Sequence, residues 1–268
     1  MRARIFLGTQ GWNYEGWLGS FYPRNSKTKE LLGLYASIFD TVEVDSTFYA
    51  IPSENSVKGW MERTPASFSF SLKLPAEITH KNRLRDSQSI LEQFIQRINL
   101  LEDKLGCLLI QLPPDFSPNE QSAFNSFIDL LPSHPRFAVE FRDSGWLNEQ
   151  TINILARKNV ALALTDSRWI HRTSSFRIID NYTADFAYVR WLGHRDLTDY
   201  SRIQIDRTKE LTQWSEAFAA LQEKVTAIYG YFNNHFQGHS PASCNLFKEM
   251  IGLPVTRPES LIKQPSLF

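Results

Sequence analysis

Thr41-Val42-Glu43-Val44-Asp45-Ser46-Thr47-Phe48-Tyr49 is a β-branched run that ends in two carboxylates and an aromatic pair. Because side chains alternate across a strand, Val42 and Val44 share one face, while Glu43 and Asp45 share the other. Charges on a buried strand are costly unless they are paired with other groups. The pattern therefore predicts a buried strand whose end contributes to a functional site.

Short apolar segments of this kind recur along the chain and are separated by stretches long enough for helices. Helical periodicity is clearest around Phe94 and Trp214, Ser117-Pro118-Asn119-Glu120 is typical of a capping box, and Ser240-Pro241 is expected to cap a last helix that ends at Gly252. Residues 166–185 are expected to form a long connection. The predicted strands are residues 4–8, 41–45, 67–74, 107–112, 137–141, 160–165, 186–191 and 227–232.

This order of elements is typical of an α/β protein with a TIM-like (β/α)₈ barrel, and no glycine-rich dinucleotide fingerprint follows the first strand. No linker-like change of composition divides the chain before its end. We therefore predict a single barrel domain over residues 1–252. Prolines interrupt residues 253–268, which we expect to form a flexible tail.

The composition is that of a globular protein: 268 residues, 42% hydrophobic and 22% charged. The 29 basic and 29 acidic residues give no net charge, which argues against a strongly basic nucleic-acid binder. No apolar run is long enough for a secretory signal or a membrane span, so we expect a cytoplasmic protein without a membrane partner. Cys107 and Cys244 are expected to be buried apolar side chains.

In TIM barrels the functional end is the one where the strands end. Alternation places Ala138, Glu140 and Arg142 on one face, and likewise Leu162 and Asp166. We interpret polar residues gathered at these strand ends as a functional site. The alternative interpretation is a ring of salt bridges that only closes the barrel. The polar residues at the predicted strand ends are Gln10, Glu43, Asp45, Lys73, Gln111, Glu140, Arg142, Asp166, Arg190, Asn233 and Asn234.

Seven segments of the chain stand out as motifs: residues 8–14, 42–49, 73–80, 111–114, 139–142, 188–190 and 231–235. Together they resemble the motifs of the YecE-like domain-of-unknown-function family, number seventy-two. The resemblance spans nearly the whole chain and implies a TIM-like barrel without an established activity. Gln10 and Asp45 stand where Ser and Asn are commoner in the family, and Asp45 adds a charge.

Three classes of function remain open for these residues. The leading one is a hydrolase or lyase for a phosphorylated or nucleic-acid-derived substrate, with Arg142 and Arg190 on phosphate. The second is a metal-free carbonyl or sugar enzyme that uses Lys73, and the third is a binding module without catalysis. The candidate catalytic residues are Glu43, Asp45, Lys73, Glu140 and Asp166, and the candidate substrate-binding residues are Gln10, Trp12, Tyr14, Tyr49, His80, Gln111, Arg142, Arg190, Asn233, Asn234 and His235.

The sequence does not identify a cofactor. No nucleotide-cofactor motif is present, and acids with His235 and His239 nearby are compatible with a divalent metal, although satisfied loop histidines are the commoner case. The aromatic residues Trp12, Tyr14 and Tyr49 indicate either stacking on a sugar or base, or a hydrophobic lid.

The chain ends in Gln264-Pro265-Ser266-Leu267-Phe268, which resembles the short motif that binds the bacterial sliding clamp. Leu267 and Phe268 would enter an apolar pocket as part of an extended peptide, with Gln264 beside them. The alternative is that the two apolar residues pack back onto the barrel. Clamp binding would favour a substrate derived from nucleic acid.

Overall fold

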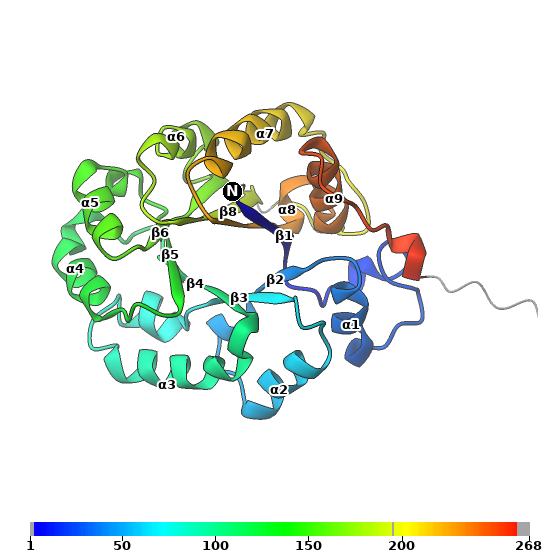
Figure 1. The fold of residues 1–268 in the computed structure, drawn as a ribbon, viewed down its shortest axis with the longest axis horizontal. Coiled ribbons are helices and arrows are strands. Elements are labelled where there is room, and N and C mark those ends of the chain that lie inside the picture. Colours follow the sequence, from blue (N-terminus) through cyan, green and yellow to red (C-terminus); the bar gives the residue numbers. More distant parts are fainter. Residues whose placement is uncertain (1–2, 195, 262–268) are drawn as a thin grey trace, which may run out of the picture.

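The computed structural model describes residues 3–194 and 196–261. Parallel strand segments in the order β6-β5-β4-β3-β2-β1-β9-β8-β7 form one sheet that curves into a barrel, with the helices outside it (Figure 1). The TIM-like fold predicted from the sequence is confirmed. The strands are β1 Arg4–Gln10, β2 Thr41–Val44, β3 Ser69–Lys73, β4 Leu105–Gln111, β5 Arg136–Glu140, β6 Ala161–Leu162, β7 Leu164–Ser167, β8 Phe186–Gly193 and β9 Ala227–Phe232.

The barrel closes through a strand that is split in two. β6 pairs with β5, β7 pairs with β8, and Ala163 lies between them. The backbone N–H of Ala163 donates to the carbonyl of Val139 at 2.8 Å, so this residue continues the ladder across the break. β6 and β7 therefore occupy one position in the barrel, which has the eight positions expected of the fold.

Helices follow most of the strands and cover the barrel (Figure 1). The connection over residues 166–185, expected to lack a firm helix, contains the short α6 and a turn of 3₁₀-helix at Ile179–Asn181. The helices are α1 Leu31–Ala36, α2 Glu54–Glu62, α3 Gln88–Ile98, α4 Gln121–Leu130, α5 Glu149–Arg157, α6 Arg172–Phe176, α7 Thr208–Gln222, α8 Asn234–Gln237 and α9 Ser240–Met250.

Two predicted helix caps differ from the structure. Ser117 makes no side-chain cap, and Glu120 binds Arg83 at 2.5 Å and Arg85 at 2.8 Å instead of completing a capping box. Residues Pro118–Glu120 form a 3₁₀ turn before α4. At α9 the N-cap is His239, whose Nδ1 accepts from the N–H of Ala242. An imidazole thus performs the role that the sequence assigned to a hydroxyl.

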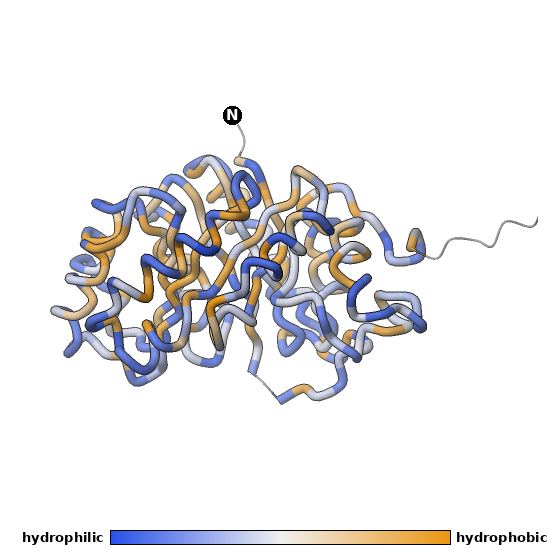
Figure 2. The backbone as a smooth tube through the Cα atoms, turned by 90° about the horizontal axis from the view of Figure 1, so that it is seen from below, coloured by the Kyte–Doolittle hydropathy of each residue, from blue (hydrophilic) through white to orange (hydrophobic). Residues whose placement is uncertain are grey.

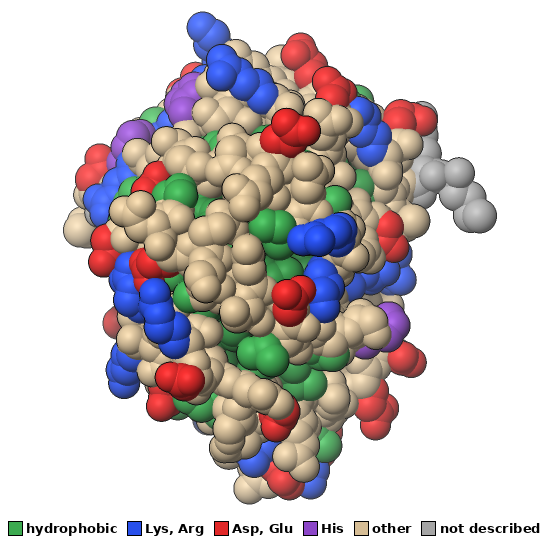
Figure 3. Space-filling model, turned by 90° about the vertical axis from the view of Figure 1, so that its left-hand side faces the viewer, with side chains coloured by type: hydrophobic (Ala, Val, Ile, Leu, Met, Phe, Trp, Pro, Cys, Tyr) green, Lys and Arg blue, Asp and Glu red, His purple; other side chains and the backbone are tan. Residues whose placement is uncertain are grey.

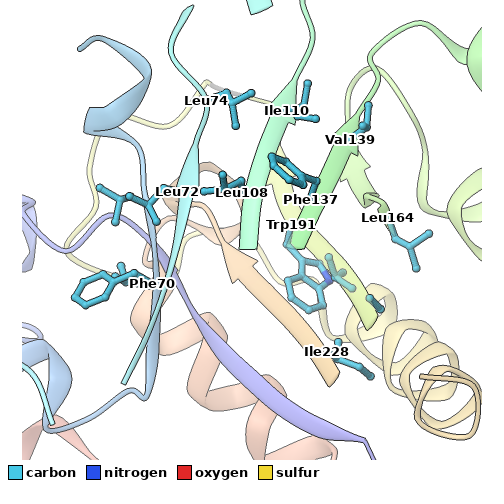
Figure 4. Packing of buried hydrophobic residues seen from close by; sticks show 14 of the residues in the cluster. Phe70, Leu72, Leu74, Leu108, Ile110, Phe137, Val139, Leu164, Trp191 and Ile228 are labelled. Atoms are coloured by element: carbon cyan, nitrogen blue, oxygen red, sulfur yellow. The ribbon is translucent and has the colours of Figure 1, made fainter. Parts of the chain in front are cut away.

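The strands present different residues to their two faces. Large apolar side chains such as Phe137 and Leu108 point toward the helices and form the main core, part of which Figure 4 shows. Full burial of such a side chain stabilises the fold by roughly 1.5–3 kcal/mol. A smaller cluster fills the barrel interior and contains Phe6, Cys107, Leu109, Ala138, Ala161, Ala163, Phe186, Tyr188, Ala227, Tyr229 and Tyr231.

Hydropathy along the chain follows this arrangement. Hydrophobic segments run through the middle of the molecule and hydrophilic ones lie toward its edges (Figure 2). On the face near α4 and α5, acidic and basic side chains are interspersed (Figure 3). Cys107 and Cys244 are buried and free, as predicted. Within the described ranges, no helix has the length and apolar character needed to span a membrane.

The side chain of Tyr35 on α1 enters the ladder between β1 and β2. Its hydroxyl accepts from the N–H of Thr9 at 2.9 Å and donates to the carbonyl of Thr41 at 2.9 Å. Gly8 makes room for this arrangement, because a Cβ there would lie 2.1 Å from the Thr41 carbonyl oxygen. The first helix is therefore hydrogen-bonded to the barrel wall.

The described part of the predicted tail contacts α9. The N–H of Leu253 donates to the Lys248 carbonyl, Arg257 pairs with Glu249 at 2.7 Å, and Leu261 packs against the core. Residues Pro258–Leu261 form a 3₁₀ turn. Gln264, Leu267 and Phe268, which carry the clamp-binding motif, lie outside the described residues.

Candidate functional site

A chain of alternating charges crosses the barrel at the end where the strands finish. Arg190 binds Glu43 through one edge of its guanidinium, with Nε at 2.9 Å and Nη2 at 2.6 Å from the two carboxylate oxygens. Its Nη1 donates to Glu140, whose other oxygen accepts from Arg142 Nε at 3.1 Å. Glu43, Glu140 and Arg190 are buried, so each charge is compensated by a neighbour rather than by solvent.

The strand register explains why residues far apart in sequence meet here. Gln10 lies opposite Glu43 on adjacent strands, Gln111 opposite Glu140, and Thr165 opposite Arg190. All of these side chains point inward because the parity of their strands matches that of the interior cluster. The predicted convergence of strand ends is therefore present for these residues.

The two buried glutamates differ in their electrostatic surroundings. Burial raises the pKa of Glu43, and Arg190 opposes this only in part while the charge of Asp45 adds to it. Burial acts in the same direction on Glu140, but Arg190 and Arg142 together outweigh it and lower the pKa of that carboxyl. Glu140 is thus the more firmly ionised of the pair.

Lys73 and Asp45 form a second ion pair, closer to solvent. Lys73 Nζ lies 3.3 Å from Asp45 Oδ1, and the two side chains are 10% and 34% exposed. The ammonium also lies 4.9 Å from the centre of the Phe48 ring. The hydroxyl of Thr47 donates to the Lys73 carbonyl at 2.8 Å, which holds the loop after β2 against β3. The pair combines a cation and an anion that a solute can reach.

Several buried polar atoms at this end have no hydrogen-bond partner in the described residues. Gln10 Oε1 accepts from Asn233 at 2.7 Å, but Gln10 Nε2 has no partner, and neither has Gln111 Oε1 nor Thr165 Oγ1. An unsatisfied buried group costs about 1–3 kcal/mol. Gln10 Nε2 can donate, Gln111 Oε1 can accept, and the Thr165 hydroxyl can do either, toward a polar molecule at the carboxyl end of the strands, which we call the mouth.

Histidine and tyrosine side chains surround the charged groups. Burial lowers the pKa of His80 to about 4, with Arg142 and Lys73 adding to the effect, so its ring is neutral near pH 7. Tyr14 donates to the carbonyl of Gln10 at 2.9 Å, and burial followed by the charge of Asp45 raises the pKa of its phenol. Tyr49 is 83% exposed and contacts Phe48 edge-on. These side chains form an aromatic rim.

Other predicted substrate-binding residues are engaged in structure. Asn234 Oδ1 accepts from Trp17, from the Ser240 N–H and from its hydroxyl, which fixes the turn before α9. His235 Nε2 lies 3.1 Å from the Tyr200 hydroxyl. Trp12 packs edge-on against Trp60. Asn234 and Trp12 therefore shape the loops around the mouth.

Asp166 does not face the mouth, contrary to the sequence prediction. Its Oδ2 accepts from Trp214 Nε1 on α7 at 3.1 Å and lies 4.0 Å from Arg172, both in the helical layer. Leu162 and Leu164 belong to the outer core, and Asp166 shares their face. The inward residue of β7 is Thr165, which the sequence reading missed.

Tyr188 also belongs to this site, although it was not among the candidate site residues predicted from the sequence. Its hydroxyl donates to Glu43 Oε2 at 2.7 Å, and the residue lies two positions before Arg190 on β8. Alternation alone places these two side chains on one face, so the signal was present in the sequence. Tyr188 completes the hydrogen bonding of Glu43.

The acidic and histidine side chains at the carboxyl end of the strands are not arranged as the ligands of a divalent metal. Within the described ranges, no three His, Cys, Asp or Glu side chains converge as metal ligands do. Glu43 and Glu140 direct their oxygens at arginines, and His239 caps α9. The pair His235 and His239 therefore gives no ligand set with these acids.

The fold and this inward-facing charged mouth define the class: a TIM-like barrel protein with a polar site at the carboxyl ends of its strands. Residues 6–266 match the model of the family described as "Protein of unknown function DUF72". The chain belongs to this family, as the motifs predicted.

Relatives and solved structures agree with this assignment. The UPF0759 protein YecE of Escherichia coli K12 is 30% identical over 79% of this chain and 82% of its own. A DUF72 family protein from Thermotoga maritima, TM1631, has a TM-score of 0.79 at 26% identity and covers 93% of this chain and 99% of its own. D-psicose 3-epimerase from Clostridium cellulolyticum, solved with D-tagatose, shares only the fold: TM-score 0.50, 9% identity, 87% and 85% coverage.

Proposed function

We propose that this protein is a metal-free enzyme that acts on a small polyhydroxylated carbonyl compound, with Lys73 as the reacting group. The observation that carries the proposal is the Lys73–Asp45 pair, 3.3 Å apart, in which Asp45 is part-exposed and Lys73 mostly buried, beside buried arginines that are already ion-paired. It places a nucleophile and its base together where a solute can arrive. A sugar would meet this pair and the unsatisfied amides of Gln10 and Gln111.

The proposed reaction begins with proton transfer from the Lys73 ammonium to the Asp45 carboxylate. The neutral amine attacks the substrate carbonyl carbon, the C–N bond forms as the C=O π bond breaks, and the oxygen takes up the proton that the nitrogen loses. Asp45 then returns its proton to the new hydroxyl, which leaves as water while the nitrogen lone pair forms the C=N bond of a protonated Schiff base. Gln10 Nε2 would donate to a substrate oxygen and Gln111 Oε1 would accept from a hydroxyl, which orients the carbonyl toward Lys73.

The hydrolase or lyase for phosphorylated or nucleic-acid-derived substrates has less support. Arg190 is held by Glu43 and Glu140, and Arg142 pairs with Glu140 and lies 3.9 Å above the Trp169 ring. A phosphate would have to displace buried carboxylates before the guanidinium of Arg190 could bind it. The mouth of this chain therefore suits a neutral substrate better than a phosphate ester.

The proposal is tested by borohydride trapping. The protein is incubated with a panel of aldoses and ketoses, reduced, and analysed by intact-mass and peptide mass spectrometry. We expect an adduct on Lys73 that is lost in Lys73→Ala and kept in Lys58→Ala, which removes an exposed lysine of α2. An adduct that persists in Lys73→Ala, or no adduct with any compound, contradicts the proposal.

Two expectations from the sequence concern the cellular setting and stay predictions. They are a cytoplasmic location and binding of the bacterial sliding clamp through Gln264, Leu267 and Phe268. If the protein binds the clamp, a carbonyl compound derived from nucleic acid, such as a deoxyribose aldehyde, would be a candidate substrate for the same Lys73 reaction. The Lys73 proposal does not depend on this partner.

A further inference from the structure

A cavity of about 420 Å³ opens at the opposite end of the barrel, where the strands begin. It is lined by the first residues of β1, β3, β4, β5 and β9 and by the turn before β3. This volume lies in the range of small-molecule sites. Nothing in the chemistry at the mouth uses this cavity, which lies at the other end of the strands.

The cavity lining combines two arginines with a pair of stacked aromatic rings. Phe6 and Tyr229 are stacked with their centres 4.9 Å apart and both are buried. Arg4 lies 4.5 Å above the Phe6 ring, and Arg136 donates to the Tyr229 hydroxyl at 3.1 Å. The two guanidinium groups are therefore held beside one apolar wall.

The charges in this cavity are not balanced by the described residues. Neither Arg4 nor Arg136 forms a salt bridge there, although Asp103 lies in the cavity lining. Burial raises the pKa of Asp40, and the charges of Lys248 and, more weakly, Arg4 act to lower it. Asp40 nevertheless forms no ion pair with Arg4 among the described residues. Two cations against one lining acid leave an excess of positive charge.

We propose that this cavity binds a small organic oxyanion, a carboxylate or a phosphate monoester, with a flat apolar body. The oxyanion would lie against the guanidinium groups of Arg4 and Arg136, whose planar donors suit both anions. The body would pack on the Phe6 and Tyr229 rings. Ser67 and Ser69 in the lining supply hydroxyl groups beside it.

The experiment measures binding of phenyl phosphate, benzoate and, as a neutral comparison, benzyl alcohol to the full chain by calorimetry and saturation-transfer NMR. We expect one or both anions to bind and benzyl alcohol not to bind. Arg136→Gln should weaken anion binding about tenfold or more, a change of about 1.4 kcal/mol. Arg24→Gln, which removes an exposed arginine outside the cavity lining, should leave it unchanged.

A second variant guards against a folding defect in the first. Ser67→Asp adds a negative charge at an exposed position of the lining and leaves both arginines in place. We expect it to abolish anion binding with an unchanged circular dichroism spectrum. Preference for phenyl phosphate would identify a phosphate monoester, and preference for benzoate a carboxylate. Absence of binding by either anion, or binding unaffected by both Arg136→Gln and Ser67→Asp, would overturn the proposal.

Discussion

On β5, Phe137 and Val139 point toward the helices, whereas Ala138 and Glu140 point into the barrel. The outer face packs by apolar contact alone, and any well-shaped hydrophobic side chain suits it. The inner face at the mouth requires specific partners, because each buried charge must meet its opposite. The two faces of one strand therefore respond differently to substitution.

The largest effect is expected from breaking the inner chain of charges. Arg190→Met leaves the carboxylates of Glu43 and Glu140 buried with fewer partners and should lower the free energy of unfolding by about 3–5 kcal/mol. Urea denaturation measures this loss. The double variant Arg190→Met with Glu43→Gln should recover part of it, because one uncompensated charge is gone. A loss of less than about 1 kcal/mol would indicate that the pairs contribute no more than surface salt bridges.

A substitution on the outer face tests apolar packing by itself. Leu108→Ala removes a buried side chain from β4 and should cost about 3 kcal/mol through lost burial and a residual cavity. The matched control is Leu130→Ala at the end of α4, where the leucine is 44% exposed and the loss should be much smaller. Thermal and urea unfolding compare the two. Equal losses would show that outer-face burial is not what stabilises the barrel wall.

The smallest effect concerns a buried polar group in the helical layer. Burial lowers the pKa of His239 from 6.5 to about 4. Between these values the unfolded chain binds a proton that the folded chain does not, so stability falls as the pH falls through this window. His239→Asn keeps a capping acceptor on α9 and should reduce the stability lost between pH 7 and pH 5 by about 2 kcal/mol.

Urea midpoints at the two pH values check this prediction, with His134→Asn as the control at an exposed loop position. His80 shares the direction of the shift, so some acid sensitivity should remain in the His239 variant. An unchanged pH dependence would show that His239 does not retain its neutral form in the folded protein.

Sequence reasoning located the strands because each is short, apolar and bounded by polar residues, as with Ala227–Phe232. It located Glu43, Lys73 and Glu140 because parity needs only local information. It chose the wrong face for Asp166, although the small residues Ala161 and Ala163 mark the inward face of that strand.

Pairing between distant side chains was beyond local reasoning. The capping box at Ser117 failed because Arg83 and Arg85, more than thirty positions away, recruit Glu120. The same limit applies to the site: Arg142 and Arg190 were predicted to bind phosphate. Alternation places Arg142 beside Glu140, but nothing in the local sequence shows that Glu140 also holds Arg190. The sequence indicates which residues lie at the strand ends. Which charged groups pair with one another follows only from the register of the strands in three dimensions.

The alternation of charges in the mouth has a consequence for how a substrate arrives. Glu43, Asp45 and Glu140 oppose Lys73, Arg142 and Arg190 within a few ångströms, so their fields cancel at a distance. Beyond the Debye length, about 8 Å at physiological ionic strength, such a group exerts little pull on a charged solute. Encounter with the mouth then depends on diffusion and shape, and its rate should vary little with salt.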